Sequence, residues 1–203
     1  QAGDIAVVYP ENLFDVDSFL KEYLNGRNQG ETNNLNGNTI VYVKLKENEN
    51  KLLFPPCTLR DVFLKYLDIL GVPKRYAVEQ LSYFASDTEQ QEKLLEMSSS
   101  RGVDLYHSYI RRERRSFLDV LNDFSSCRPS IKQLINIIPL IRPREFSISS
   151  SPNLHPGEVH LCVAVVQYLS FYKRKRRGLC STYLASLQPD KKCKTVRLWI
   201  KKG

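Results

Sequence analysis

The stretch RPREFSISSSP, residues 142–152, combines side chains that could bind a flat anion. Because successive side chains of a β-strand point to opposite faces, an extended conformation would place Arg144 and Phe146 on the same face. Arg144 could pair with a phosphate, Phe146 could carry a flat ring system, and the Ser147 hydroxyl could hydrogen-bond to the edge of that ring. An edge strand whose aromatic ring packs in the core, with its arginine reaching solvent, is an equally good interpretation of this motif alone.

A second motif, RRGLCSTYL at residues 176–184, could bind a pyrophosphate. Gly178 precedes small polar residues and a helical pattern that begins near Ser181. Such a helix start leaves the backbone N–H groups of residues 178–181 free, and the helix dipole favours negative charge there. Capping by Ser181 accounts for the same pattern in most proteins, so the motif alone does not fix a ligand.

A third candidate is the pair Arg114 and Arg115 within RRERR, residues 111–115. One of the two could turn inward to a phosphate while the other stays in solvent. The alternative is an exposed helix face whose charges pair with neighbours one turn away.

The 203-residue chain is basic, with 30 lysines and arginines against 22 acidic residues. The excess gathers in RRERR and in KRKRR, residues 173–177, which indicates an anionic ligand or partner, although a single basic run is more often a solvated surface. No apolar run of about 18 residues predicts a membrane span. The start QAGDIAVV has neither a signal peptide nor an initiating Met, and we therefore expect a fragment of a longer protein.

Cysteine and histidine spacing predicts neither a disulfide framework nor a metal site. The cysteines lack any C-x-x-C pair, and His107, His155 and His160 show no ligand spacing. We therefore predict reduced thiols and a cytoplasmic protein. The cysteines are Cys57, Cys127, Cys162, Cys180 and Cys193.

The hydrophobic pattern predicts an α+β fold in which β structure flanks a block of helices. Strands are expected between Gly3 and Pro10 and at 39–45, 144–149, 157–169 and 194–202. Helices are expected at 15–25, 58–70, 73–86, 87–97, 103–124 and 130–141, with caps at Thr58 and Asp87. We interpret residues 51–139 as a helical insertion into one antiparallel β domain made of residues 1–50 and 140–203.

The order and spacing of REFS, the strand HLCVAVVQY and the loop RRGLCSTYL resemble the FAD-binding signature of the ferredoxin-NADP reductase superfamily. The helical insertion ahead of REFS resembles the connecting domain of the diflavin reductases, and GDIAVVYPEN is similar to an early segment of their FAD domain. The resemblance implies an antiparallel β-barrel FAD-binding domain, with its first strands absent from this chain, and an inserted all-helical connecting domain. It is strongest to the soluble NADPH-dependent branch that serves cytosolic iron–sulfur cluster assembly; another diflavin reductase, of the microsomal cytochrome reductase type, is the alternative.

The same resemblance implies a role for individual residues. Arg114 and Arg144 would reach the FAD phosphates, and Phe146 would stack on the isoalloxazine ring within the strand that also carries Glu145. Ser147 would sit near the reactive N5 edge, as the catalytic position. Phe146 stands where many members carry tyrosine, so a phenol hydrogen bond to the cofactor is absent.

Further cofactor-binding positions follow from the second strand and the Gly-containing loop. The resemblance would place Cys162, Val163 and Ala164 along the flavin edge, Tyr168 near the adenine, and Gly178, Leu179, Cys180 and Ser181 around the pyrophosphate.

The resemblance also implies a parent enzyme that passes electrons from NADPH through FAD to FMN and then to an acceptor. Its partners would be the FMN-binding and NADPH-binding domains of the same polypeptide and an acidic acceptor, an iron–sulfur assembly factor. No nucleotide fingerprint follows Trp199, so we expect this chain alone to be inactive with NADPH and, with an open barrel, to bind FAD weakly.

The competing hypothesis is a non-enzymatic basic module that binds nucleic acid or an acidic protein. That hypothesis leaves REFS and GLCS unexplained as a spaced pair.

Overall fold

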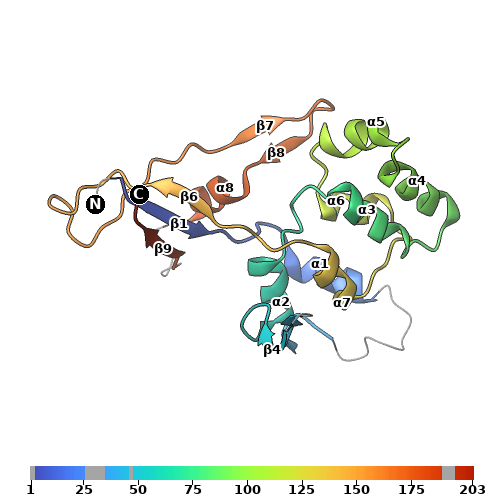
Figure 1. Ribbon diagram of the computed structural model, residues 1–203, viewed down its shortest axis with the longest axis horizontal. Helices are drawn as coiled ribbons and strands as arrows, with labels where there is room; N and C mark the ends of the chain where they lie inside the picture. The colour runs from blue at the N-terminus through green and yellow to red at the C-terminus, as the bar shows by residue number, and fades with distance from the viewer. Residues whose placement is uncertain (1–2, 26–34, 46–47, 189–194) are drawn as a thin grey trace.

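The computed structural model describes residues 3–25, 35–45, 48–188 and 195–203, which form a mixed α+β structure. Figure 1 shows the largest sheet near one end of the molecule and most helices at the other. Within the described residues, no helix is long and apolar enough to cross a bilayer. The four cysteines in this part of the chain, Cys57, Cys127, Cys162 and Cys180, are free thiols, as predicted, and Cys193 lies outside it.

The helical elements follow the predicted order with shifted bounds. They are α1 (Val16–Asn25), α2 (Leu59–Asp61), the π-helical turn η1 (Val62–Tyr66), α3 (Arg75–Ser82), α4 (Thr88–Ser98), α5 (Val103–Tyr106), the π-helical turn η2 (His107–Arg111), α6 (Phe117–Asp123), α7 (Ile131–Ile137) and α8 (Leu179–Ser186). The predicted caps are present, since Thr58 accepts from the Asp61 amide and Asp87 from the Gln90 amide.

Four of the predicted helices were too long. Those expected over 73–86 and 130–141 end at Ser82 and Ile137. The helix expected to reach residue 70 ends at Tyr66, because Leu67 has an extended backbone with ψ 128°. The single helix expected over 103–124 is broken at Arg114, whose φ of 52° is left-handed. A new helix, α6, then begins after Ser116, which forms a capping box with Asp119.

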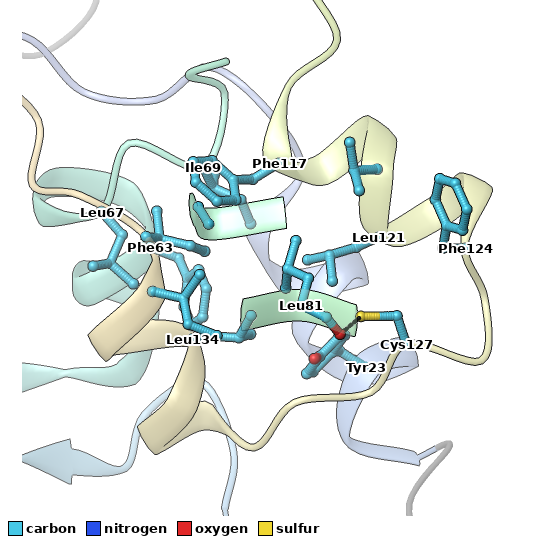
Figure 2. Packing of buried hydrophobic residues seen from close by; sticks show 14 of the residues in the cluster. Tyr23, Phe63, Leu67, Ile69, Leu81, Phe117, Leu121, Phe124, Cys127 and Leu134 are labelled. Atoms are coloured by element: carbon cyan, nitrogen blue, oxygen red, sulfur yellow. Dashed lines mark hydrogen bonds between the residues drawn. The ribbon is translucent and has the colours of Figure 1, made fainter. Parts of the chain in front are cut away.

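The largest hydrophobic core joins α1 to the helices that follow it (Figure 2). Tyr23 of α1 lies in this core with Phe63, and its hydroxyl donates to the Pro129 carbonyl oxygen at 2.7 Å. Cys127 donates from Sγ to the Leu81 carbonyl oxygen at 3.1 Å, the contact drawn as a dashed line in Figure 2. The domain boundary at residues 50 and 51 stays a proposal. The packing of α1 in this core favours a helical unit that includes α1.

The largest sheet has three antiparallel strands in the order β6-β1-β9. Its central strand is β1 (Ile5–Tyr9), flanked by β6 (Arg144–Ser147) and β9 (Arg197–Lys201). Ala6 faces Phe146 on one side and Ile200 on the other. Three two-stranded sheets pair β2 (Ile40–Val41) with β5 (Cys57–Thr58), β3 (Lys44–Leu45) with β4 (Asn48–Leu52), and β7 (Gln167–Leu169) with β8 (Lys175–Arg177).

The β structure is more fragmented than the sequence predicts. The strand expected at 39–45 is divided into β2 and β3. The strand expected at 157–169 is regular only in β7, apart from a bridge between Ile148 and Leu161. The strand expected from Lys194 is β9, and Lys194 itself lies outside the described residues. No closed barrel forms among the described strands, because β6 and β9 each have one edge without a strand partner there.

Candidate functional site

A cleft of about 820 Å³ lies where β6, the β7–β8 hairpin, the start of α8 and the loop after η1 come together. The size is within the range of cofactor pockets. The structure brings ten of the predicted cofactor-binding residues to its walls: Arg114, Arg144, Glu145, Phe146, Ala164, Tyr168, Gly178, Leu179, Cys180 and Ser181.

Three predicted residues do not line this cleft. Ser147 is exposed on β6, where it faces Ile5 of β1. Cys162 is exposed and Val163 is half-buried in the segment that precedes β7. The roles predicted for these three residues therefore stay predictions.

Strand β6 presents the first motif at the edge of the sheet. The Arg144 side chain is exposed, and its Nη1 donates to the Arg142 carbonyl oxygen at 2.7 Å. Phe146 is half-buried, while Glu145 pairs with Lys201 of β9 at 3.3 Å between Oε1 and Nζ. Arg144 and Phe146 therefore remain available to a molecule in the cleft.

The start of α8 offers fewer free amides than the sequence suggests. Gly178 is the N-cap, but its N–H already donates to the Val166 carbonyl oxygen at 2.8 Å, so the prediction that this amide is free was wrong. The amides of Leu179, Cys180 and Ser181 form the first turn, where no intrahelical carbonyl is within reach. The first turn of α8 can thus supply N–H donors to an anion.

Close packing requires glycine at this helix start. A Cβ atom on Gly178 would lie 2.8 Å from Ser181 Oγ and 2.9 Å from Val166 Cβ. Ser181 Oγ accepts from the Val166 amide at 3.1 Å and fixes this approach. The backbone before β7 is therefore held directly against the first turn of α8.

The basic run at 111–115 is only partly exposed, because Glu113 and Arg115 are buried. The Arg112 guanidinium lies 3.4 Å from the centre of the Phe171 ring. Arg115 is 9% exposed and forms an ion pair with Asp123. The alternative interpretation of Arg114 and Arg115 as a solvated pair is therefore wrong for Arg115.

The acidic residue inside this run, Glu113, joins the helices to the β7–β8 hairpin. Its side chain is almost fully buried and accepts from Ser170 Oγ at 2.7 Å and from the Tyr172 amide at 3.3 Å. Its carbonyl oxygen accepts from Arg176 Nε at 2.9 Å, and Arg176 also pairs with Asp119 at 2.8 Å. We call Glu113, Ser170, Tyr172 and Arg176 the Glu113 clamp.

Arg114 follows the clamp directly and lines the cleft with a left-handed backbone, φ 52°. This conformation costs a non-glycine residue roughly 1–2 kcal/mol. It is held from both sides, because Glu113 is fixed to the hairpin and the Arg115 amide donates to the Ile110 carbonyl oxygen at 3.0 Å. The fold therefore maintains a strained residue at the wall of the cleft.

Comparison with known proteins shows the family to which the chain belongs. A profile of the FAD binding domain matches residues 1–183. The chain belongs to this FAD-binding family. It is 47% identical over 150 residues to NADPH-dependent diflavin oxidoreductase 1 of Danio rerio, which covers 73% of this chain and 25% of the relative. It is 34% identical over 211 residues to the protein of the same name from Arabidopsis thaliana, covering 100% of this chain and 32% of the relative.

NADPH–cytochrome P450 reductases form a second group of relatives, with identities of 31% and 34% in Drosophila melanogaster and Sus scrofa. NADPH–cytochrome P450 reductase of Drosophila melanogaster is 31% identical over 194 residues, covering 93% of this chain and 27% of the relative. The chain thus corresponds to the FAD-binding region of diflavin reductases and spans a third or less of the length of these relatives.

The donor set of the cleft fits FAD, the cofactor of this family. Arg114, Arg144 and Lys175–Arg177 line it, and Arg176 Nη2 and Thr182 Oγ1 are buried with no hydrogen-bond partner among the described residues. Buried polar groups normally have hydrogen-bond partners, so these two atoms indicate that a polar group bound in the cleft contacts them. Cationic donors with a helix N-terminus are the groups that bind a pyrophosphate.

Asp68 lines the cleft together with Glu145, and a carboxylate there opposes a bound anion. Burial raises the pKa of the Asp68 carboxyl, and nearby Arg144 and the Gly71 backbone N–H offset only part of that increase. Sequence reasoning missed Asp68, Gly71 and Val72, which carry no motif. It also missed Arg176 as a cleft residue, although KRKRR was visible.

Proposed function

We propose that this chain holds FAD in the 820 Å³ cleft, as the FAD-binding part of an NADPH-dependent diflavin reductase. The observation that supports this best is the convergence of Arg114, of β6 and of the first turn of α8 on one cleft, although they are far apart in the sequence. When bound, FAD would supply the hydride and single-electron chemistry. The protein's contribution is binding, orientation and charge compensation.

The arginines and the first turn of α8 would neutralise the pyrophosphate. We propose that Arg114 and Arg144 donate to its oxygens together with the amides of Leu179, Cys180 and Ser181. Each charge-assisted hydrogen bond contributes about 1.5–3 kcal/mol. The buried, unpartnered Nη2 of Arg176 supports a further contact to the same group.

The flavin ring would lie along β6. In this proposal Phe146 stacks on the isoalloxazine, contributing about 0.5–1.5 kcal/mol and excluding water from one face. Ser147, one residue further along, would meet the N5 edge with its exposed hydroxyl. This arrangement requires the ring to extend past the cleft along the strand.

The remaining predicted contacts involve the segment before and within β7. Ala164 and Tyr168 line the cleft and are proposed to contact the flavin edge and the adenine, respectively. Cys162 and Val163 would continue the backbone edge beyond the cleft. Glu145, which also lines it, would complete the β6 wall.

The wider role is proposed from the relatives. Electrons would enter from an NADPH-binding domain and leave through an FMN-binding domain to an acidic acceptor, an iron–sulfur assembly factor, in the cytoplasm. The free strand edges of β6 and β9 support the closure of a barrel by further strands. The higher identity to the diflavin oxidoreductase of Danio rerio favours this branch over the cytochrome P450 reductase type.

The competing hypothesis of a basic module that binds nucleic acid or an acidic protein does not account for the convergence of REFS and GLCS on one cleft. Within the basic run at 111–115, Arg115 is buried and pairs with Asp123, and Arg112 contacts the Phe171 ring, while the other arginines of the run are exposed. Nucleic-acid binding needs such charges at the surface, available to phosphates.

The experiment is an FAD titration of the apo-protein, followed by quenching of flavin fluorescence. We expect saturable binding that Arg144→Ala weakens by about tenfold or more, equivalent to the loss of one charge-assisted hydrogen bond. Arg142→Ala, two residues earlier and also exposed, is the matched control and should bind as the wild type does. Equal affinity of the Arg144 and Arg142 variants would refute the phosphate role, and absence of FAD binding to the wild type would refute the proposed site. With FAD added, the chain alone should not oxidise NADPH.

A further inference from the structure

Two of the three histidines of the chain meet in the loop that follows β6. The candidate ligand atoms of His155, Glu158 and His160 all lie within 4.8 Å of one another, on side chains that are exposed. Glu158 Oε2 is 2.9 Å from Nε2 of His160 and 3.8 Å from Nδ1 of His155. The two imidazole rings are 4.4 Å apart between their centres.

The backbone beneath these side chains is fixed by its own hydrogen bonds. Ser150 is 6% exposed, and its Oγ accepts from the His160 amide at 3.1 Å and donates to the Glu158 carbonyl oxygen at 3.3 Å. The His155 amide donates to the Ser151 carbonyl oxygen at 2.9 Å. Much of the ordering that a metal site requires is therefore already present in the loop.

The turn between the ligands depends on glycine. Gly157 has a φ of 80°, a conformation that L side chains rarely adopt, and the Glu158 amide donates back to the His155 carbonyl oxygen at 3.3 Å. This turn brings His155 and Glu158 to the same side as His160. The sequence spacing alone does not reveal the convergence, because it matches no familiar ligand motif.

We propose that His155, Glu158 and His160 form a surface site for Zn²⁺, completed by water. Two imidazole nitrogens and one carboxylate oxygen are ligands that zinc prefers, and three protein ligands with an open fourth position are a known arrangement. Ligand atoms around tetrahedral zinc lie about 3.3 Å apart when each bond is about 2.0 Å. The separations of 2.9 and 3.8 Å from Glu158 Oε2 bracket that value, and the two imidazole nitrogens lie within 4.8 Å of each other, so zinc binding requires side-chain rotations that bring the histidines to the metal.

The test is zinc binding by the untagged full chain after chelator treatment and dialysis, measured by calorimetry and by metal analysis. We expect one zinc per chain. His160→Ala and Glu158→Gln should each weaken binding by about tenfold or more. FAD is not needed for this measurement, so it is independent of the proposed function.

Two control variants separate this site from other ligands. His107→Ala removes the third histidine, which is exposed on η2, and Cys162→Ser removes the exposed thiol two residues beyond His160. Both should bind zinc as the wild type does, and circular dichroism should show that all variants are folded. Absence of zinc binding would overturn the proposal and leave the hydrogen bond between His160 and Glu158 as the reason for the cluster. Loss of binding in either control, or its survival in His160→Ala, would also overturn it.

Discussion

Glu113 accepts a hydrogen bond from the Ser170 hydroxyl at 2.7 Å, joining residues that are 57 positions apart in the sequence. Through this bond the chain segment between η2 and α6 holds the end of the β7–β8 hairpin. The hairpin forms one wall of the cleft, and Arg114, the neighbour of Glu113, lines it as well. One buried carboxylate therefore positions two walls of the same site.

Replacing Glu113 with alanine should destabilise the protein by about 1.5–3 kcal/mol, because Ser170 and the Tyr172 amide lose a charged acceptor. Glu113→Gln should have a smaller effect, since one acceptor oxygen remains. The measurement is the free energy of unfolding in urea. Glu92→Ala, at an exposed position of α4, is the control and should change it by less than about 0.5 kcal/mol. Equal effects at positions 113 and 92 would rule out the clamp.

Replacing Arg114 with glycine should have opposite effects on stability and on cofactor binding. Relief of the left-handed strain, roughly 1–2 kcal/mol, is offset in part by the roughly 0.5–1 kcal/mol that glycine loses in backbone entropy. We expect a free energy of unfolding that is unchanged or up to about 1 kcal/mol higher, while FAD affinity falls by about tenfold or more.

The control for this variant is Arg111→Gly, three residues earlier in the helical backbone of η2. There glycine should lower the free energy of unfolding by about 1 kcal/mol and leave FAD affinity nearly unchanged. A clear loss of stability in Arg114→Gly, or unchanged FAD affinity, would contradict the role assigned to Arg114.

The residues of the site were predictable from sequence where the chemistry is local. Arg144, Phe146 and the α8 start belong to short motifs whose residue types match a phosphate, a flat ring and a helix N-terminus, and the structure places all three at one cleft. The helical caps at Thr58 and Asp87 were predictable for the same reason, since capping depends on residues within one turn.

Features that depend on distant contacts were not predictable. Glu113 reads as one acid in a basic run, and its burial becomes visible only when the hairpin packs against it. The left-handed Arg114 ends a helix that periodicity extends through this point. Asp68 joins the cleft because Leu67 ends its helix early. In each case tertiary packing overrides the local pattern.

Alanine at Gly178 should disturb the cleft, because the added Cβ would meet Val166 Cβ at 2.9 Å, an atom that cannot rotate away. Separating the two segments should lower the free energy of unfolding by about 1–3 kcal/mol and weaken FAD binding. Gly37→Ala is the matched control, since its nearest neighbour would be at 3.6 Å and its backbone needs no positive φ. Equal stability of the two variants would show that the close approach is unimportant.

The pH dependence of stability should change when Asp68 is replaced with asparagine. Burial raises the pKa of Asp68, so the folded state holds this proton to a higher pH than the unfolded state does. As the pH rises from the ordinary carboxyl pKa through the raised pKa of folded Asp68, ionisation of this group lowers the free energy of unfolding. That decrease persists at higher pH. The free energy of unfolding of Asp68→Asn minus that of the wild type should therefore rise over this pH range and then level off.

This difference isolates Asp68, because the other titrating groups are common to both proteins. Among them is Asp119. Burial raises the pKa of Asp119, but hydrogen bonds from Ser116 and Arg176 lower it by a larger amount, so that the pKa lies below its ordinary value. The contribution of Asp119 to the pH dependence of stability therefore has the opposite sign. Urea unfolding of both proteins at a series of pH values from about 3.5 to 7.5 gives the comparison. A difference that is constant with pH, or that falls as pH rises, would contradict the raised pKa. If the cleft binds the FAD pyrophosphate as proposed, removing this negative charge should also tighten FAD binding at neutral pH, which the same fluorescence titration measures.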